Sequence, residues 1–222
     1  MEPRRHSDDL PHRPQRCDSS QVGRRRPRAF PSAQWIGHCQ RLIELEARFP
    51  AVQRGDEEPS NATEKAEFAW FAAKFKQLNS LATRWYGEAF DAKPHLAENL
   101  QTALRYGAAC TAARAASGRG QDADKISYTE QARSRQQCLT WLRADLDLWA
   151  KQLEDKRAGA AAARLTLQQW QRELDLASLR EDVALGNLPV AEKGAWRKLW
   201  ADVAALLKQA RELEKRTDSK KP

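Results

Sequence analysis

The sequence predicts an all-α fold, built as an array of antiparallel helices. Good helix formers, chiefly Ala, Leu, Gln, Glu, Arg and Lys, dominate the 222 residues. No strand-like run of alternating β-branched residues occurs, and the chain holds only 10 Gly and 3 Tyr. Apolar residues recur at steps of three and four in several stretches, which is the spacing of one helical face. A chain of this length is also long enough to bury a sizeable core.

Residues 1–31 form an Arg- and Pro-rich arm that we expect to be disordered, because little of it can be buried. This arm holds eight Arg against four acidic residues, a net charge of +4, and residues 208–222 carry +3. Only +1 of the formal net charge of +8 is left for the middle. Nucleic-acid binding needs cations clustered on a surface, so it is not expected of the body and stays an alternative for the arm alone.

The four Cys are Cys17, Cys39, Cys110 and Cys138, and none forms a C-x-x-C pair. The first thirty residues lack the apolar segment of a signal peptide. No run approaches the roughly 18 apolar residues that a membrane helix needs. We therefore expect a cytoplasmic protein with reduced thiols and no membrane partner.

The first predicted helices lie between Ser32 and Ala92. Ser32 is the expected N-cap of a helix that ends at Phe49 and Pro50, and residues 50–62 are the expected linker because they hold Gly, Pro and Asn breakers. A helical hairpin follows, with helices over residues 62–76 and 78–92. The inner face of the first helix is expected to contain Trp35, Ile36, Cys39, Leu42, Ile43 and Leu45.

The second helix of this hairpin resembles the second helix of a tetratricopeptide repeat. Ala82, Tyr86, Ala89 and Pro94 match the repeat's small, aromatic and terminating positions. The first-helix signature of the repeat is not kept. The resemblance implies one degenerate tetratricopeptide-like hairpin within the array.

Two further helices are predicted over residues 96–117 and 129–155, joined by a polar loop at residues 118–124. Gly107 and several Ala lie on the expected inner face of the first. Ser127 and Glu130 form a capping-box pattern just before the second, whose apolar stripe holds Cys138, Leu142, Leu146, Trp149 and Leu153. Arg143, Asp145, Asp147 and Lys151 fall between these positions and are expected to face solvent.

The C-terminal third continues the helical pattern from Leu165 to Leu174. Ser178 and Glu181 form a second capping-box pattern before a short helix that ends at Gly186. The last helix is predicted from Val190 to Leu213, and residues 214–222 are expected to fray as a basic tail. The helical domain therefore spans residues 32–213. Its predicted core residues are Trp85, Tyr86, Tyr106, Cys110, Leu142, Leu146, Trp149, Trp196 and Trp200.

Several segments in this order resemble the C-terminal helical region of large bacterial (planctomycete-type) serine/threonine protein kinases. They include RYGAAC, GRGQDA, CLTWLRADLDLWAKQLE, LTLQQWQRELDLASLRE and EKGAWRKLWADVAALLKQA. The resemblance covers about residues 41–210 and departs from the family at Gly107, where Asn is expected. In that family a kinase domain precedes a tetratricopeptide-rich helical part. The resemblance implies kinship with the helical part only.

The residues of a catalytic site are not found. The kinase Gly-rich loop, the H-R-D Asp and the D-F-G Asp are missing, and Gly118-Arg119-Gly120 is a lone G-x-G without a preceding strand. Asp122 and Asp124 could open a calcium loop, but Ser127 and Arg133 stand where the EF-hand needs Gly and Glu. Cys110 and Cys138 have the character of small core residues. The sequence thus predicts no catalytic residue, no cofactor and no metal site.

The function expected from these observations is a non-catalytic interaction or regulatory module, because helical arrays present concave faces to peptides and proteins. Two alternatives stay open. One is a truncated or split fragment of a serine/threonine protein kinase. The other is nucleic-acid binding through the Arg-rich arm of residues 1–31.

Overall fold

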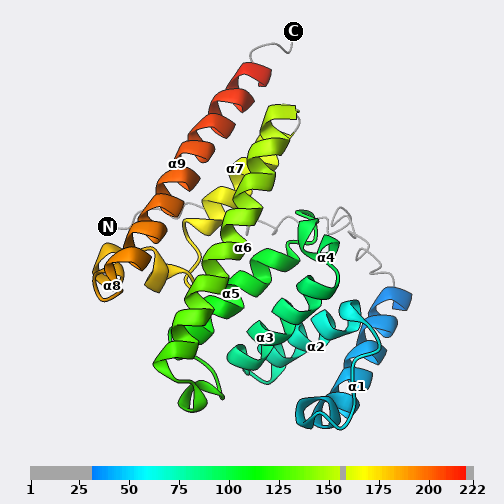
Figure 1. Ribbon diagram of the computed structural model, residues 1–222. Coiled ribbons are helices and arrows are strands. Elements are labelled where there is room, and N and C mark those ends of the chain that lie inside the picture. Colours follow the sequence, from blue (N-terminus) through cyan, green and yellow to red (C-terminus); the bar gives the residue numbers. More distant parts are fainter. Residues whose placement is uncertain (1–31, 156–158, 219–222) are drawn as a thin grey trace, which may run out of the picture. The chain divides into compact units, whose positions relative to one another are not determined.

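The computed structural model describes residues 32–155 and 159–218, and every regular element in these ranges is helical. The all-α class predicted from the sequence is therefore confirmed. The predicted disorder of residues 1–31 lies outside the described residues. The α-helices are α1 (Ser32–Arg54), α2 (Ala62–Phe75), α3 (Asn79–Ala92), α4 (His95–Glu98), α5 (Leu104–Ala116), α6 (Tyr128–Asp155), α7 (Ala160–Trp170), α8 (Asp182–Gly186) and α9 (Val190–Asp218) (Figure 1).

The chain divides into two compact units, residues 1–43 and residues 44–222. The described part of the first unit is the beginning of α1, where Trp35 packs edge-on against His38 at 6.4 Å between ring centroids. Trp35, Ile36 and Ile43 are more than half exposed, and Cys39 is exposed too. The inner face predicted for this stretch is therefore wrong at these four positions. Helical spacing shows that residues share one face of a helix, but it does not show that another element packs on that face.

Helix α1 does not end at Pro50 as predicted but continues to Arg54. A proline inside a helix removes one backbone hydrogen bond and crowds the preceding turn, at a cost of about 3 kcal/mol. Phe49 and Val52, on either side of Pro50, are 3% and 6% exposed. Their burial offsets this cost, so the linker begins only at Gly55.

Helices α2 and α3 form an antiparallel hairpin, as predicted. Asn61 caps α2 by accepting hydrogen bonds from the backbone N–H groups of Thr63 and Glu64. Lys65 near the start of α2 pairs with Glu88 near the end of α3 at 2.8 Å, which shows the opposite directions of the two helices. The buried residues of α3 fall at helical spacing and include Ala82, Trp85, Tyr86, Ala89 and Phe90.

The single helix predicted over residues 96–117 is wrong, because the chain breaks between α4 and α5. The Asn99 side chain accepts a hydrogen bond from the N–H of Gln101 at 2.9 Å, so it competes with helix formation. Ala103 then adopts a left-handed conformation with φ of +50°. Gly107 is not on the inner face either, since it is exposed and a Cβ atom there would meet no atom within 4 Å.

Helix α6 packs along α5, as the short loop between them predicts. The two helices are joined by a buried ion pair, in which the Arg105 Nε donates to Asp145 Oδ1 at 2.7 Å. Asp145 is 3% exposed, so its predicted place on the solvated face is wrong. Asp147, two residues further, does face solvent.

The C-terminal elements are α7, α8 and α9, and Figure 1 shows α9 running alongside α6 and α7. The second predicted capping box is wrong, because Ser178 lies in a 3-10 turn and Glu181 is an N-cap without a side-chain hydrogen bond. α9 begins at Val190 as predicted. It remains helical to Asp218, so residues 214–218 do not form the predicted frayed tail.

Candidate functional site

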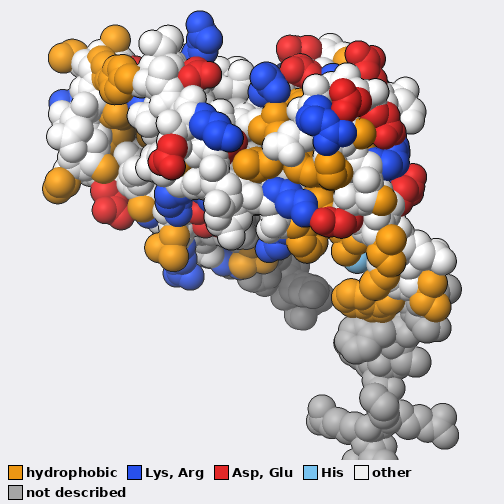
Figure 2. Space-filling view, turned by 90° about the horizontal axis from the view of Figure 1, so that it is seen from below, with side chains coloured by type: hydrophobic (Ala, Val, Ile, Leu, Met, Phe, Trp, Pro, Cys, Tyr) orange, Lys and Arg blue, Asp and Glu red, His pale blue; other side chains and the backbone are white. Residues whose placement is uncertain are grey.

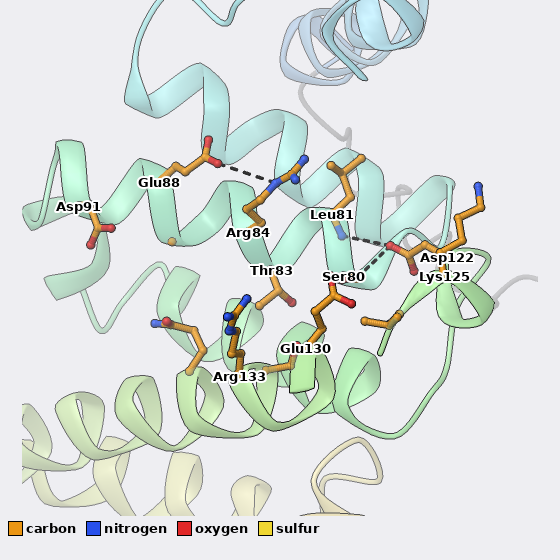
Figure 3. A pocket seen from close by; sticks show the side chains of 14 residues that line it. Ser80, Leu81, Thr83, Arg84, Glu88, Asp91, Asp122, Lys125, Glu130 and Arg133 are labelled. Atoms are coloured by element: carbon orange, nitrogen blue, oxygen red, sulfur yellow. Dashed lines mark hydrogen bonds and ion pairs between the residues drawn. The ribbon is translucent and has the colours of Figure 1, made fainter. Parts of the chain in front are cut away.

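The candidate site is an open groove of about 540 Å³ between α3 and α6. Figure 3 shows side chains of both helices and of the α5–α6 loop along it. All of the lining residues belong to the unit of residues 44–222. They are Ser80, Leu81, Thr83, Arg84, Gly87, Glu88 and Asp91 of α3, Asp122, Lys125 and Ile126 of the loop, and Glu130, Arg133, Ser134 and Gln137 of α6.

The groove exists because α3 and α6 both pack on α5. α5 ends at Ala116 and leads into the loop of residues 118–127, which contacts the start of α3 through Asp122 and continues into the start of α6. α3 and α6 therefore begin at the same end of the groove. At the opposite end the rings of Phe90 and Trp141 meet edge-on at 5.5 Å and join the two helices. Between these two ends α3 and α6 leave the groove open.

The floor of the groove is small and polar. Thr83 and Ser134 are 7% and 6% exposed. Gly87 adds no side chain, and a Cβ atom there would meet no atom within 4 Å. Hydroxyl groups both donate and accept hydrogen bonds, although the Thr83 hydroxyl already donates to the Asn79 carbonyl at 2.8 Å.

The loop end of the groove is held by Asp122. Its Oδ2 accepts hydrogen bonds from the backbone N–H groups of Ser80 and Leu81 at 2.9 and 3.0 Å, so Asp122 caps α3 from a distant part of the chain. Its other oxygen is buried without a hydrogen-bond partner among the described residues. Asp122, considered above as a calcium ligand, is therefore a helix cap.

Gly120 lets the loop approach the start of α3. Its φ is +133°, and a Cβ atom there would lie 2.5 Å from the Gln77 carbonyl oxygen. The neighbouring Gln121 N–H donates to that oxygen at 2.8 Å, and the Asn79 amide donates to the Arg119 carbonyl at 2.6 Å. The lone G-x-G is thus the point at which the loop docks on α3.

We expect Gly120→Ala to lower the free energy of unfolding by about 1–3 kcal/mol, because Ala is strained at this φ and clashes with backbone. The matched control is Gly107→Ala, at a helical glycine with open space around it. It is expected to raise the stability by about 0.5–1 kcal/mol. Urea unfolding of both variants checks the pair, and equal midpoints would contradict the docking role of Gly120.

The start of α6 is fixed by the predicted capping box, which is confirmed. The Ser127 N–H donates to Glu130 Oε2 at 2.8 Å, and the Glu130 N–H donates to Ser127 Oγ at 3.2 Å. The hydrogen bond from the Ser127 backbone is the main reason that the pKa of Glu130 is lowered. Glu130 therefore stays ionised and committed to the helix end.

The predicted core residues lie away from the groove. Tyr106 and Trp200 are only half-buried: the Tyr106 ring stacks on Trp170 at 5.4 Å, and the Trp200 indole donates to the Leu179 carbonyl at 2.7 Å. Burial raises the pKa of Cys110 to about 12, so this thiol stays protonated at neutral pH. The remaining predicted core residues, Trp85, Tyr86, Leu142, Leu146, Trp149 and Trp196, are each at most 7% exposed.

Three further observations concern the described part of the chain. Within residues 32–155 and 159–218, no group of three or more His, Cys, Asp or Glu side chains is placed to hold a metal ion. Over the same residues, no helix combines the length and apolarity needed to span a membrane. Figure 2 shows Lys and Arg side chains mixed with Asp and Glu on the face that it draws.

None of the groove residues belongs to a binding site predicted from the sequence. The signal was a second, polar stripe on each helix: Ser80, Arg84, Gly87 and Asp91 are four, three and four residues apart. Glu130, Arg133 and Gln137 repeat this helical spacing on α6. Polar stripes at helical spacing usually face solvent, so the pattern does not reveal a groove unless the positions of both helices are known.

Comparison of the chain with protein-family models, with curated proteins and with solved structures gives no match.

Proposed function

We propose that the chain is a non-catalytic helical module that binds a peptide segment of another protein in the groove between α3 and α6. The observation that carries this proposal is the groove itself, with its volume of about 540 Å³, its polar floor and its charged rims. Ligand sites in proteins commonly have volumes of about 300–1,000 Å³. Concave faces of helical arrays typically bind peptides or other proteins.

The chemistry of the floor suits a peptide backbone. An extended peptide presents one N–H donor and one C=O acceptor per residue. The Ser80 and Ser134 hydroxyls and the Gln137 amide can supply both kinds of partner. None of the described residues lining the groove is His or Cys, and its hydroxyls have no such base beside them to activate a nucleophile. These features favour binding over catalysis.

The resemblance to kinase-associated helical regions supports the same proposal. Ala82, Tyr86 and Ala89, the tetratricopeptide-like positions of α3, are at most 2% exposed. α2 and α3 form a hairpin of two 14-residue helices, as a degenerate repeat requires. We therefore relate the module to the accessory helical part of such kinases, with a cytoplasmic protein or peptide as its partner.

The test is selection of peptides from a random library on the full chain, followed by binding measurements on two variants. Gly87→Tyr places a side chain in the groove at a position where a Cβ atom meets nothing. Gly107→Tyr is the matched control, at an equally open helical glycine outside the groove. We expect Gly87→Tyr to abolish binding of the selected peptides and Gly107→Tyr to leave it unchanged. Equal binding by both variants, or a selection that yields no peptide, would overturn the proposal.

A further inference from the structure

We propose that the groove selects a peptide with an acidic and a basic side chain about three to five positions apart, the acidic one at the loop end. This inference rests on the proposed function and adds the chemistry of the partner. It follows from the charges along the groove and from which of them are already committed to other groups.

Three cations, Arg84, Lys125 and Arg133, line the part of the groove nearest the loop, and none of them has a close ion pair among the described residues. Arg84 has only a loose ion pair, with 3.8 Å between its Nε and Glu88 Oε1. No Asp or Glu of the described residues lies within ion-pair distance of Lys125 or Arg133. Figure 3 shows Arg133 extending from α6 toward α3, with Lys125 beside Asp122 at the loop. A carboxylate entering here would meet guanidinium and ammonium donors.

Two carboxylates, Asp122 and Glu130, face these three cations, so they do not cancel them in full, although Arg133 interacts electrostatically with Glu130. Both carboxylates are also held by backbone N–H groups. Asp122 accepts from Ser80 and Leu81 at the start of α3, and Glu130 accepts from Ser127 at the start of α6. These N–H groups carry the partial positive charge of the helix N-termini. The loop end therefore keeps a positive character.

The opposite end of the groove has the reverse sign. Asp91 lies in the last turn of α3, is exposed, and has no Lys or Arg of the described residues within ion-pair distance. The neighbouring Glu88 is already engaged by Lys65 at 2.8 Å. The C-terminal end of a helix carries partial negative charge, which adds to that of Asp91. A basic side chain is the complementary group here.

The distance between the two ends sets the spacing in the peptide. Arg84 and Asp91 are seven residues apart on α3, which corresponds to about 10 Å at 1.5 Å per residue. The loop contacts α3 at Ser80, whose N–H donates to Asp122, and Ser80 is eleven residues before Asp91, which corresponds to about 16 Å along the helix. An extended peptide advances about 3.3 Å per residue. The acidic and basic side chains must therefore be about three to five positions apart to reach both ends.

The experiment uses two labelled nine-residue Ser/Ala peptides, each with one Glu and one Arg four positions apart, in the two possible orders. NMR titration of the full chain detects weak binding. We expect Arg133→Glu and Asp91→Lys each to raise the Kd of the better-bound peptide by about tenfold, as for loss of a charged hydrogen bond. Asp147→Lys, an exposed charge change on α6 outside the groove, is expected to leave the Kd unchanged.

A second pair of peptides assigns each charge to its end. When Ser replaces Arg in the peptide, we expect Asp91→Lys no longer to raise the Kd, whereas Arg133→Glu still raises it. When Ser replaces Glu in the peptide, we expect Arg133→Glu no longer to raise the Kd, whereas Asp91→Lys still raises it. The inference is overturned if Arg133→Glu and Asp91→Lys act no differently from Asp147→Lys. If Gly87→Tyr abolishes binding of the library peptides but Arg133→Glu and Asp91→Lys leave their Kd unchanged, the peptide-binding function holds. In that case only the selection by charge fails.

Discussion

Replacing Asp145 with Ala is expected to lower the free energy of unfolding by about 3–5 kcal/mol. Asp145 and Arg105 are 3% and 8% exposed, and one of the Arg105 terminal nitrogens already lacks a hydrogen-bond partner among the described residues. Truncation of Asp145 would leave a guanidinium buried between α5 and α6 without a counter-ion. Urea unfolding, followed by circular dichroism at 222 nm, measures the change.

Two controls separate this effect from a general sensitivity of α6. Asp147→Ala removes an exposed carboxylate from the same helix and is expected to change stability by no more than about 0.5 kcal/mol. The double variant Arg105→Met/Asp145→Leu is expected to recover most of the loss. Desolvation of two buried charges offsets much of their attraction, so an intact buried ion pair stabilises little on balance. The same burial raises the pKa of Asp145, and the Arg105 guanidinium opposes this shift. A midpoint for Asp145→Ala equal to that of Asp147→Ala would contradict the buried pair.

Replacing Trp149 with Ala is expected to destabilise the chain by a similar amount, about 3–5 kcal/mol, because a buried aromatic side chain leaves a cavity. Trp149 is 3% exposed and lies on the apolar stripe of α6 together with Leu142, Leu146 and Leu153. Such a loss is a large share of the roughly 5–15 kcal/mol that stabilises a typical domain. The same urea titration gives the measurement.

The control for Trp149 is Leu174→Ala, because Leu174 is 79% exposed. Its expected effect is within about 0.5 kcal/mol. Unchanged midpoints for Trp149→Ala would mean that this stripe is accessible to a partner and does not form the core.

The helices themselves were largely predictable because each stripe of apolar residues is a local pattern. The N-terminus of α6 was also predictable, since Ser127 and Glu130 satisfy each other's backbone N–H groups within a single turn. The similar pattern of Ser178 and Glu181 failed, because the chain there forms a 3-10 turn before α8. A capping-box pattern indicates that two side chains can accept hydrogen bonds from two backbone N–H groups. It does not by itself predict that a helix follows.

The errors have a common physical origin in contacts that local sequence does not encode. Pro50 stays within α1 because its neighbours Phe49 and Val52 are buried by other elements. Asp145 is buried because its partner Arg105 comes from another helix, 40 residues earlier in the chain. The groove was missed for the same reason, since its two polar stripes become opposing walls only when both helices pack on α5.

The cap that Asp122 provides for α3 also bears on the order in which the chain folds. The α2–α3 hairpin is complete in sequence at Ala92, yet the first turn of α3 obtains its acceptor from a residue 42 positions later than Ser80. A nascent chain that ends before this loop would hold α3 with its leading N–H groups unpaired. The α2–α3 hairpin therefore gains the side-chain cap of its second helix only when the α5–α6 loop has formed and docks on it.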